Sequence, residues 1–446
     1  MLMHYTRMSR PQVISAVMLY VVLTYSPSAA ELSSAVTSLP EPLTLEYALS
    51  LADDMTPDIQ QRQADVMAAE AGLREAESFS GFNAYLEARA LWIEPAAVAI
   101  DQSDEDHRLG LIANKTLYDF GRSRAAESAA NYTLSASQIQ FASARRLHRI
   151  LIMQRFFEVL LADLQFYRYN EEMAVVFIDM DRMKDRRELG QASDLDVLEK
   201  EVEYQRIRHL RYKSENEQRR TRARLAQALN RPGNLPSTVA MPELKHLERK
   251  LAEVKAYQMA ALENNPTVRA LRLQVAAAEQ AVTQARSSNN PRLTGQLEAY
   301  SYERELGSSD KWRAGVILEV PLWTGGTSDA SIATAQAGLY RNRARLREIE
   351  INIEQTILET WLDLDALRIR LQEMQTTADY RELYLDRSRA LYEMEVKADL
   401  GDAMVRVSEA ERNLRKIQFD ITLGWERLEA LVGQDLSLIK HSKQTN

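Results

Sequence analysis

The sequence predicts a mainly α-helical chain with a small β portion, in which one structural unit occurs twice. Three observations lead to this fold class. Proline is missing from two very long stretches, four shorter stretches alternate between apolar and polar side chains, and the pattern recurs 205 residues further along the chain.

The stretches without proline are expected to form long helices. No proline occurs between Pro95 and Pro232, and none follows Pro321. Proline breaks the interior of a helix, so its absence permits helices of about 100 Å at 1.5 Å per residue. We expect four long helices, at residues 123–189, 193–230, 327–396 and 400–432.

One of these segments has the spacing of a coiled-coil seam. Its apolar residues advance by threes and fours: Leu346, Ile349, Ile353, Ile357, Trp361, Leu364, Leu367 and Leu371. A mean step between 3.5 and 3.6 residues is typical of helices packed side by side. A coiled coil that encloses no tunnel would show the same spacing, so this segment alone leaves both alternatives open.

Four stretches alternate as β-strands with one apolar and one polar face do. They are residues 83–92, 107–118, 292–302 and 312–321. Ala88 and Val316 belong to the apolar series, and Glu87 and Glu319 to the polar series. The second stretch is interrupted by two residues that break the alternation, Ile112 and Lys115. The length of these stretches is also that of a membrane-spanning strand.

Identical or similar residues at one shared offset indicate an internal duplication. The residues separated by 205 positions include Gly110 and Gly315, Leu117 and Leu322, Gly121 and Gly326, Phe156 and Trp361, and Asp194 and Asp399. We place the first repeat at residues 31–242 and the second at 243–446. Each half is expected to contain a short helix, two strands, a very long helix, a turn and a second helix.

Four strands cannot close a membrane barrel by themselves. Small barrels need about eight strands, and an open sheet edge in lipid is very costly because its backbone groups have no partners. If these strands lie in a membrane, the chain must therefore form an oligomer.

The N-terminus predicts export. Arg7 and Arg10 precede a short apolar stretch, and Ser28-Ala29-Ala30 provides small residues before Glu31, so residues 1–30 are expected to be a signal peptide. Without Arg7 and Arg10, the chain has 54 basic and 64 acidic residues, so its formal charge is −10. This negative charge argues against nucleic acid as a partner. The chain has no cysteine, so its stability must come from packing and assembly.

Six short motifs in a fixed order resemble those of the TolC family of outer-membrane efflux and secretion proteins. They are Leu43–Leu49, Thr56-Pro57, Leu117–Arg122, Gly190–Val197, Asn265-Pro266 and Val320–Gly326. The resemblance implies a homotrimer in which each chain gives four strands to a shared 12-stranded β-barrel in outer-membrane lipid and long helices to a periplasmic α-barrel. It also implies a passive duct of a tripartite efflux pump or type I secretion system, working with a periplasmic adaptor protein and an inner-membrane transporter.

The resemblance also assigns candidate residues to three places. Strand-to-helix junctions are expected at Gly121, Pro321, Gly325 and Gly326, since glycine permits the turn and proline cannot continue a β-ladder. Adaptor docking is expected at the helical tip formed by Gly190, Ser193, Asp194 and Asp196. A periplasmic aperture is expected at Asp399 and Asp402, which share a helix face at positions i and i+3. The alternative role of these two aspartates is to cap the start of a helix.

The sequence contains no constellation typical of an enzyme. The six histidines are scattered without metal-ligand spacing, and neither a phosphate-binding loop nor a nucleophile elbow occurs. We therefore expect no catalytic, cofactor or metal site. The alternative function is a periplasmic coiled-coil adaptor or scaffold that does not span a membrane, although it would not explain the four alternating strands. The sequence leaves open the cargo, the transporter class and the resting state of the channel.

Overall fold

The computed structural model describes residues 39–54, 56–233, 237–244, 247–304, 310–394 and 399–438. The expected signal peptide at residues 1–30 lies outside these ranges. Residues from Leu39 onward form one compact unit.

The elements of this unit alternate between helices and pairs of strands. In chain order they are α1 (Leu45–Ser50), α2 (Pro57–Ser78), β1 (Phe82–Arg89), β2 (Arg108–Tyr118), α3 (Arg122–Glu188), α4 (Asp194–Ala228), α5 (Val254–Asn264), α6 (Pro266–Arg286), β3 (Arg292–Tyr302), β4 (Trp312–Glu319), α7 (Thr327–Glu393) and α8 (Leu400–Val432). Short 3-10 turns follow α1, α6 and α8.

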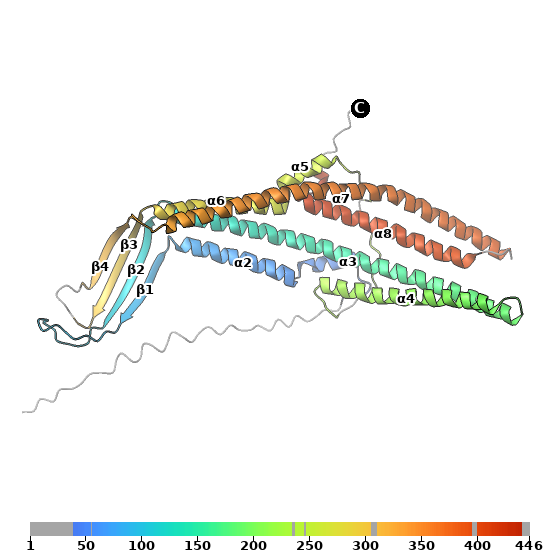
Figure 1. The fold of residues 1–446 in the computed structure, drawn as a ribbon, viewed down its shortest axis with the longest axis horizontal. Helices are drawn as coiled ribbons and strands as arrows, with labels where there is room; N and C mark the ends of the chain where they lie inside the picture. Colours follow the sequence, from blue (N-terminus) through green and yellow to red (C-terminus); the bar gives the residue numbers. More distant parts are fainter. Residues whose placement is uncertain are drawn as a thin grey trace, which may run out of the picture. The chain divides into compact units, whose positions relative to one another are not determined.

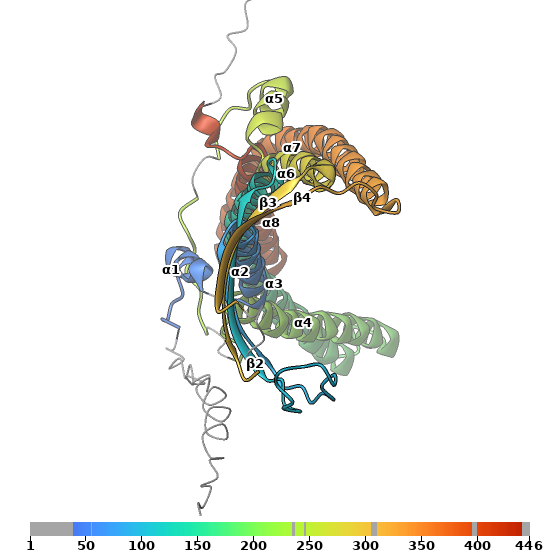
Figure 2. The same ribbon diagram turned by 90° about the vertical axis from the view of Figure 1, so that its left-hand side faces the viewer.

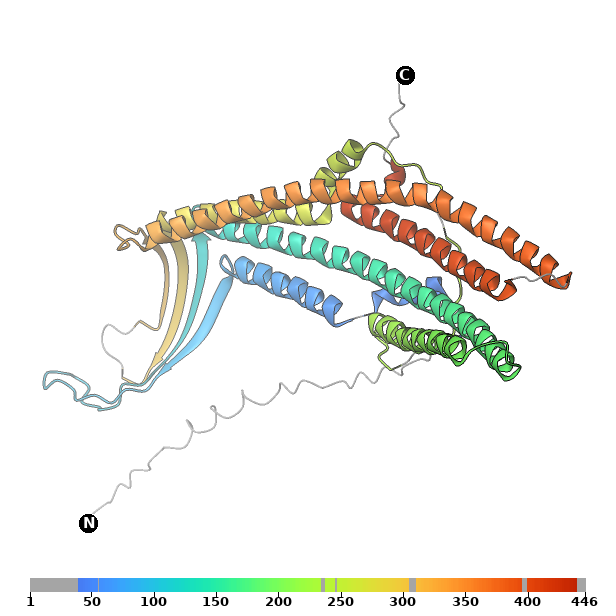
Figure 3. The same cartoon turned by 45° about the vertical axis from the view of Figure 1, so that its right-hand side comes forward.

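The two longest helices correspond in length and position. α3 and α7 each contain 67 residues, and α7 begins 205 residues after α3. At 1.5 Å per residue each is about 100 Å long. The strands lie at one end of these helices, and the C-terminal ends of α3 and α7 lie at the other, close to the first residues of α4 and α8 (Figures 1 and 3).

The expectation of one short helix before each pair of strands is wrong. A short helix, α1 or α5, is followed by a longer one, α2 or α6, with 22 and 21 residues. The cause lies at Thr56-Pro57 and Asn265-Pro266. Each proline occupies the first turn, where it is tolerated, and the preceding side chain accepts a hydrogen bond from the backbone N–H of Ile59 or Val268.

Two strands and three helices end one to three residues earlier than expected, among them α3 at Glu188 and α4 at Ala228. β1 ends at Arg89, and Trp92 forms only an isolated bridge with Glu105. β4 ends at Glu319, two residues before Pro321, which has no N–H to give to a ladder. α7 ends at Glu393, and the last residues expected for it lie outside the described ranges.

The strands form one antiparallel sheet in the order β1-β2-β3-β4. The two hairpins are joined by the pairing of β2 with β3, which places Gly110 opposite Tyr300 and contains one irregularity between Thr116 and Tyr118. Within the described residues, β1 and β4 each have one unpaired edge.

The helices and the sheet follow one arc. α3 packs against α2, α4, α6 and α8, and α7 packs against α5, α6 and α8. Figure 2, viewed from the sheet end, shows the sheet and long helices curving around an open side, with α1 and α5 on the convex side of the arc. The concave side is therefore lined by the long helices and by one face of the sheet.

Two hydrophobic cores hold the helices together. The first joins α1, α3 and α4 around Phe156, Phe157 and Leu225, and it also contains Phe419 and Leu423 of α8. The second joins α5, α7 and α8 and contains all eight residues of the expected coiled-coil seam, four buried and four packed against them: Ile353, Ile357, Leu364, Leu371, Leu346, Ile349, Trp361 and Leu367. That spacing therefore marks the face of α7 that packs within its own half.

Candidate functional site

The pleat of the sheet sorts its side chains onto two faces of different polarity. Ala84 lies opposite Ala113, Ala113 opposite Leu297, and Leu297 opposite Ala314, so these four side chains share one face. The two-residue period adds further apolar members to this face: Phe82, Leu86, Ala88, Leu109, Leu111, Leu293, Ala299, Trp312, Val316 and Leu318. It is interrupted by three residues, Lys115, Gly295 and Ser301.

The opposite face is mostly polar. Ile112 lies opposite both Tyr85 and Glu298, and Glu298 lies opposite Arg313. The other polar members are Asn83, Glu87, Arg89, Arg108, Asn114, Thr116, Arg292, Thr294, Gln296, Tyr300, Tyr302 and Glu319. Ala88 and Val316 thus fall on the apolar face and Glu87 and Glu319 on the polar face, as the alternation indicates.

The charges of the polar face are neutralised in pairs. Near one end of the sheet, a carboxylate oxygen of Glu87 lies 2.7 Å from Arg89 Nε and 3.5 Å from an Arg108 guanidinium nitrogen. At the other end, Arg292 and Glu319 approach to 2.5 Å. Paired charges of this kind suit a water-filled interior and would be very costly in lipid.

Aromatic side chains stand at both ends of the apolar face. Phe82 begins β1 beside the helices, and Trp312 begins β4 at the far end of the sheet. Their side chains are 65% and 74% exposed within one chain. A strand of eight residues spans about 26 Å, close to the apolar band of an outer-membrane protein, which aromatic residues flank at both interfaces.

Both strand-to-helix junctions turn on a glycine in the left-handed region. Gly121 (φ 90°) and Gly326 (φ 84°) are the N-caps of α3 and α7, and Gly325 also has a positive φ of 62°. A side chain there would be strained. At the first junction, Asp119 accepts hydrogen bonds from the backbone N–H of Gly121 (3.2 Å) and Ser123 (2.7 Å). Pro321 lies between the end of β4 and the second junction.

The turn between α3 and α4 is built by four expected residues. Gly190 (φ 71°) ends α3. Ser193 caps α4 and forms a reciprocal capping box with Asp196, while Asp194 lies 3.6 Å from Arg187. The backbone N–H and then the hydroxyl of Ser193 hold the pKa of Asp196 below its usual value.

The second tip places the two aperture candidates differently. Asp399 is the N-cap of α8, but its exposed side chain makes no capping hydrogen bond. A carboxylate oxygen of Asp402 lies 3.4 Å from Arg406 Nε, and this carboxylate raises the pKa of Arg406. Asp399 therefore precedes the first turn of α8 without capping it, whereas Asp402 lies in that turn and pairs with Arg406.

The first part of α8 is held closely against α3, which the sequence does not reveal. Gly401 leaves no room for a side chain, since a Cβ atom there would lie 2.8 Å from Cγ1 of Val175. Further along, the Ser408 hydroxyl donates to Glu171 (2.5 Å), and Arg168 on α3 lies 4.0 Å from Glu409. These contacts fix the α7–α8 hairpin against the α3–α4 hairpin.

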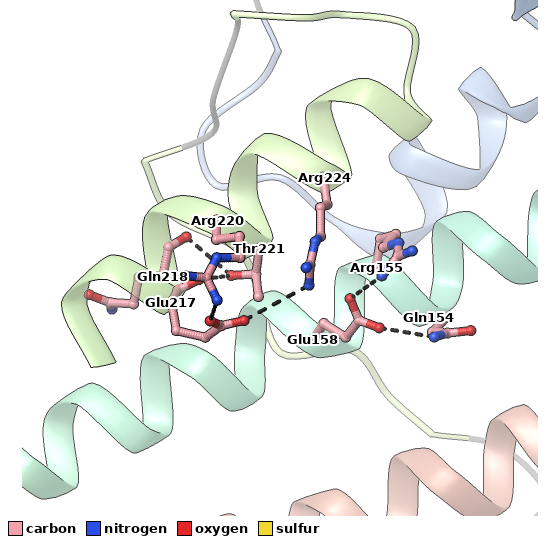
Figure 4. Close-up of polar contacts among 8 residues, drawn as sticks. All are labelled: Gln154, Arg155, Glu158, Glu217, Gln218, Arg220, Thr221 and Arg224. Atoms are coloured by element: carbon pink, nitrogen blue, oxygen red, sulfur yellow. Dashed lines mark hydrogen bonds and ion pairs between the residues drawn. The ribbon is translucent and has the colours of Figure 1, made fainter. Parts of the chain in front are cut away.

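The acidic residues of the long helices are mostly paired locally. Figure 4 shows Glu158 of α3 bound to Gln154 (2.9 Å) and Arg155 (2.7 Å) of its own helix, and Glu217 of α4 bound to Arg220 (2.6 Å). Pairs at i,i+3 and i,i+4 are typical of solvated helix faces. Within the described ranges, no group of three or more histidine, aspartate or glutamate side chains could hold a metal ion.

One ion pair between helices is stronger. The Arg222 guanidinium of α4 makes two hydrogen bonds with the Asp163 carboxylate of α3, at 2.7 and 2.9 Å, and Gln218 adds a third at 2.8 Å. Both charged side chains are largely buried. This bidentate geometry fixes the relative position of α3 and α4.

Within the part of the chain that the structure describes, none of the helices combines the length and the hydropathy needed to cross a membrane.

Comparison with known proteins gives consistent matches. Residues 258–434 match the family described as outer membrane efflux protein. Protein CyaE of Bordetella pertussis is 24% identical over 345 residues, which cover 73% of this chain and 70% of that protein. Among solved structures, the Campylobacter jejuni CmeC outer membrane channel matches with a TM-score of 0.74 and 13% identity, covering 87% of this chain and 85% of that one.

The outer membrane protein VceC of Vibrio cholerae matches with a TM-score of 0.71 and 17% identity, covering 87% of this chain and 96% of that one. At these identities the two structures establish the fold. Together with the family match, they confirm the resemblance derived from the sequence, and both the family and the fold are those of passive channels rather than enzymes. Residues 258–434 thus match the outer membrane efflux protein family, and the chain has the fold of TolC-like outer-membrane channels.

Proposed function

We propose that three copies of this chain form a passive export duct, with a 12-stranded barrel in the outer membrane and a helical tunnel in the periplasm. The observation that carries the proposal is a sheet with one apolar face and two unpaired edges. Four strands are too few to close, and lipid does not tolerate open edges. Three copies supply 12 strands and leave no edge.

The helices continue the same wall. β2 and β4 lead through single turns into α3 and α7, so the sheet and the long helices follow one arc (Figure 2). We place the polar face of the sheet on the concave side of this arc. A polar barrel interior would therefore open directly into the tunnel. Cargo would pass without chemical change, driven by an inner-membrane transporter.

The periplasmic end is proposed to be the gate. The contacts of Gly401 with Val175 and of Ser408 with Glu171 hold the α7–α8 hairpin against α3. Dilation requires this hairpin to move away from α3, which is a two-state rearrangement of packed helices. Asp399 and Asp402 lie at the start of α8, so three copies would gather six carboxylates around the entrance.

The turn at Gly190, Ser193, Asp194 and Asp196 is proposed to dock the periplasmic adaptor. It protrudes from the end of the long helices (Figure 3) and is kept rigid by the capping box. Its neighbours include exposed apolar side chains: Leu189 at 71% and Leu195 at 73%. Exposed apolar groups beside fixed polar ones are typical of a protein-binding surface.

A periplasmic coiled-coil adaptor is the rival function. It would leave the apolar face of the sheet and its aromatic ends in water, where they have no role. Membrane fractionation followed by single-channel recording distinguishes the two. A duct requires detergent to be extracted from the outer membrane and conducts ions in a planar bilayer, whereas an adaptor is released without detergent and does not conduct.

A further inference from the structure

The internal repeat makes it possible to derive how neighbouring copies pair. Within the first half, Ala84 lies opposite Ala113, and within the second, Leu293 lies opposite Leu318. The residue number in β3 is 209 higher than that of its equivalent in β1, and the residue number in β4 is 205 higher than that of its equivalent in β2. Both hairpins therefore have the same register, and these two offsets relate the halves strand by strand.

The first half contacts the second half through elements whose equivalents in the reverse direction, from the second half to a first half, do not pack extensively together among the described elements. Where the first half meets the second, β2 pairs with β3, and α3 packs against α6 and α8. The equivalent contacts of the second half with a following first half would join β4 to β1, and α7 to α2 and α4. Among the described elements, none of these pairs packs extensively within one chain. A second copy is the partner whose first half would make them.

The exposed fractions of equivalent residues in α3 and α7 show which face of α7 a second copy would cover. Ile152 of α3 and its equivalent Ile357 of α7 are both 0% exposed, because each faces a partner within its own half. Phe157 is 1% exposed, since Phe419 of α8 stacks on it with ring centroids 4.3 Å apart. Its equivalent on α7, Leu362, is 52% exposed. The difference is confined to the face that turns toward the next half.

The sheet has the same asymmetry. Ile112 of β2 is 4% exposed, whereas its equivalent Ile317 of β4 is 48% exposed. The Tyr300 ring covers Gly110, where a Cβ atom would lie 2.3 Å from Cε1 of that ring. Nothing lies within 4 Å of a Cβ atom built on Gly315, the equivalent of Gly110. β4 thus has a free edge shaped like the edge of β2 that β3 occupies.

We propose that β4 of one copy pairs with β1 of the next so that Leu318 lies opposite Ala88 of the partner subunit. The register follows from the pair Ala113 and Leu297, which joins β2 to β3 within one chain. The equivalent of Ala113 in β4 is Leu318, 205 residues later, and the equivalent of Leu297 in β1 is Ala88, 209 residues earlier. This inference rests on the trimeric assembly proposed above and specifies its seam.

The derived register passes two independent physical tests. It brings apolar faces together, since Val316 meets Ala90 of the partner subunit on the same side as Leu318. It also places Leu91 of the partner subunit opposite Gly315, where its side chain can cover the glycine as Tyr300 covers Gly110. Leu91 lies just beyond β1, but its carbonyl already accepts a hydrogen bond from Asp106 (2.9 Å), so the ladder extends that far.

The same register predicts a charged seam on the polar face. Glu319 meets Glu87 of the partner subunit, at the place where Asn114 meets Gln296 within the chain. Two carboxylates directly opposite each other repel. Each carboxylate is already paired with arginine, Glu319 with Arg292 and Glu87 with Arg89 and Arg108. These guanidinium groups on both sides of the seam offset the repulsion between the two carboxylates.

Disulfide trapping tests the register, because the native chain has no cysteine. The test variant combines Ala88→Cys with Leu318→Cys in the full chain, purified in detergent and oxidised. β1 and β4 of one chain are three strand spacings apart, about 14 Å, so a disulfide can form only between copies. We expect covalent trimers as the main species on a denaturing gel, and none from either single variant.

Two matched variants shift the register by two residues on the same face. Leu318→Cys is combined with Leu86→Cys or with Ala90→Cys, pairs that lie diagonally and are too far apart for an unstrained disulfide. Crosslinking of either shifted pair before the Ala88 pair, or of none of the three in an intact trimer, overturns the register. Mass measurement of the same samples in detergent separates this outcome from failure of the assembly itself, which a monomer would reveal.

Discussion

A positive charge on the apolar face of the sheet should prevent assembly in the membrane. Leu297 is the central residue of the eleven in β3, so it lies about 17 Å from either end of the strand. Its side chain lies between Ala113 and Ala314 and is 55% exposed in one chain. Arginine near the bilayer midplane costs about 2–4 kcal/mol, and Leu297→Arg places it there.

Assembly multiplies this cost. The three copies of Leu297 would be far apart, so their costs should add to about 6–12 kcal/mol per trimer. At 1.4 kcal/mol per factor of ten, the equilibrium constant for assembly falls by at least about 10⁴. The matched control is Gln296→Arg, which adds the same charge to the neighbouring residue, on the polar face between Asn114 and Gly315.

Fractionation and conductance measure the difference between these two variants. We expect Leu297→Arg to be lost from the outer-membrane fraction, and Gln296→Arg to remain there as a trimer with altered ion selectivity. Equal loss of both variants, or an intact membrane trimer of Leu297→Arg, would refute the assignment of the two faces.

Three further predictions concern the helical tips. Gly401→Leu should loosen α8 from α3 by overpacking worth about 1–3 kcal/mol and raise single-channel conductance, whereas Gly338→Leu, in open space on α7, should leave conductance unchanged. Multivalent cations added at the periplasmic side should block the native channel, and undiminished block after Asp399→Asn with Asp402→Asn would exclude the aperture. Acidification should speed amide exchange at the start of α4, since the stabilisation from the lowered pKa of Asp196 is present above the ordinary carboxyl pKa and lost as pH falls through the lowered value; exchange that does not change with pH would contradict this.

The sequence predicts the two faces of the sheet well in strands where apolar and polar side chains alternate. β3 and β4 alternate except at Gly295, Ser301 and Ile317, and their register preserves that alternation. β2 is less regular for two structural reasons. Ile112 lies on the polar face but is buried between neighbouring strands, and Lys115 lies on the apolar face opposite Phe82, at the end of the sheet next to the helices. A single-strand pattern cannot show such effects, because they depend on the strands on either side.

The candidate site is predicted unevenly. The glycines at the junctions and at the α3–α4 turn are recognisable, because a positive φ strongly favours glycine. Gly401 has no such local signal, since it is required by the approach of Val175 from another helix. The pairing of Asp163 with Arg222 and the contact of Ser408 with Glu171 likewise join residues that are distant in the sequence. The roles proposed for Asp399 and Asp402 stay predictions.

The mass of the protein extracted from the outer membrane in detergent tests the central claim most directly. Four strands with two unpaired edges require partners, so the account predicts a stable assembly of three chains that dissociates only when the sheet is lost. A stable monomer that retains its strands would contradict it.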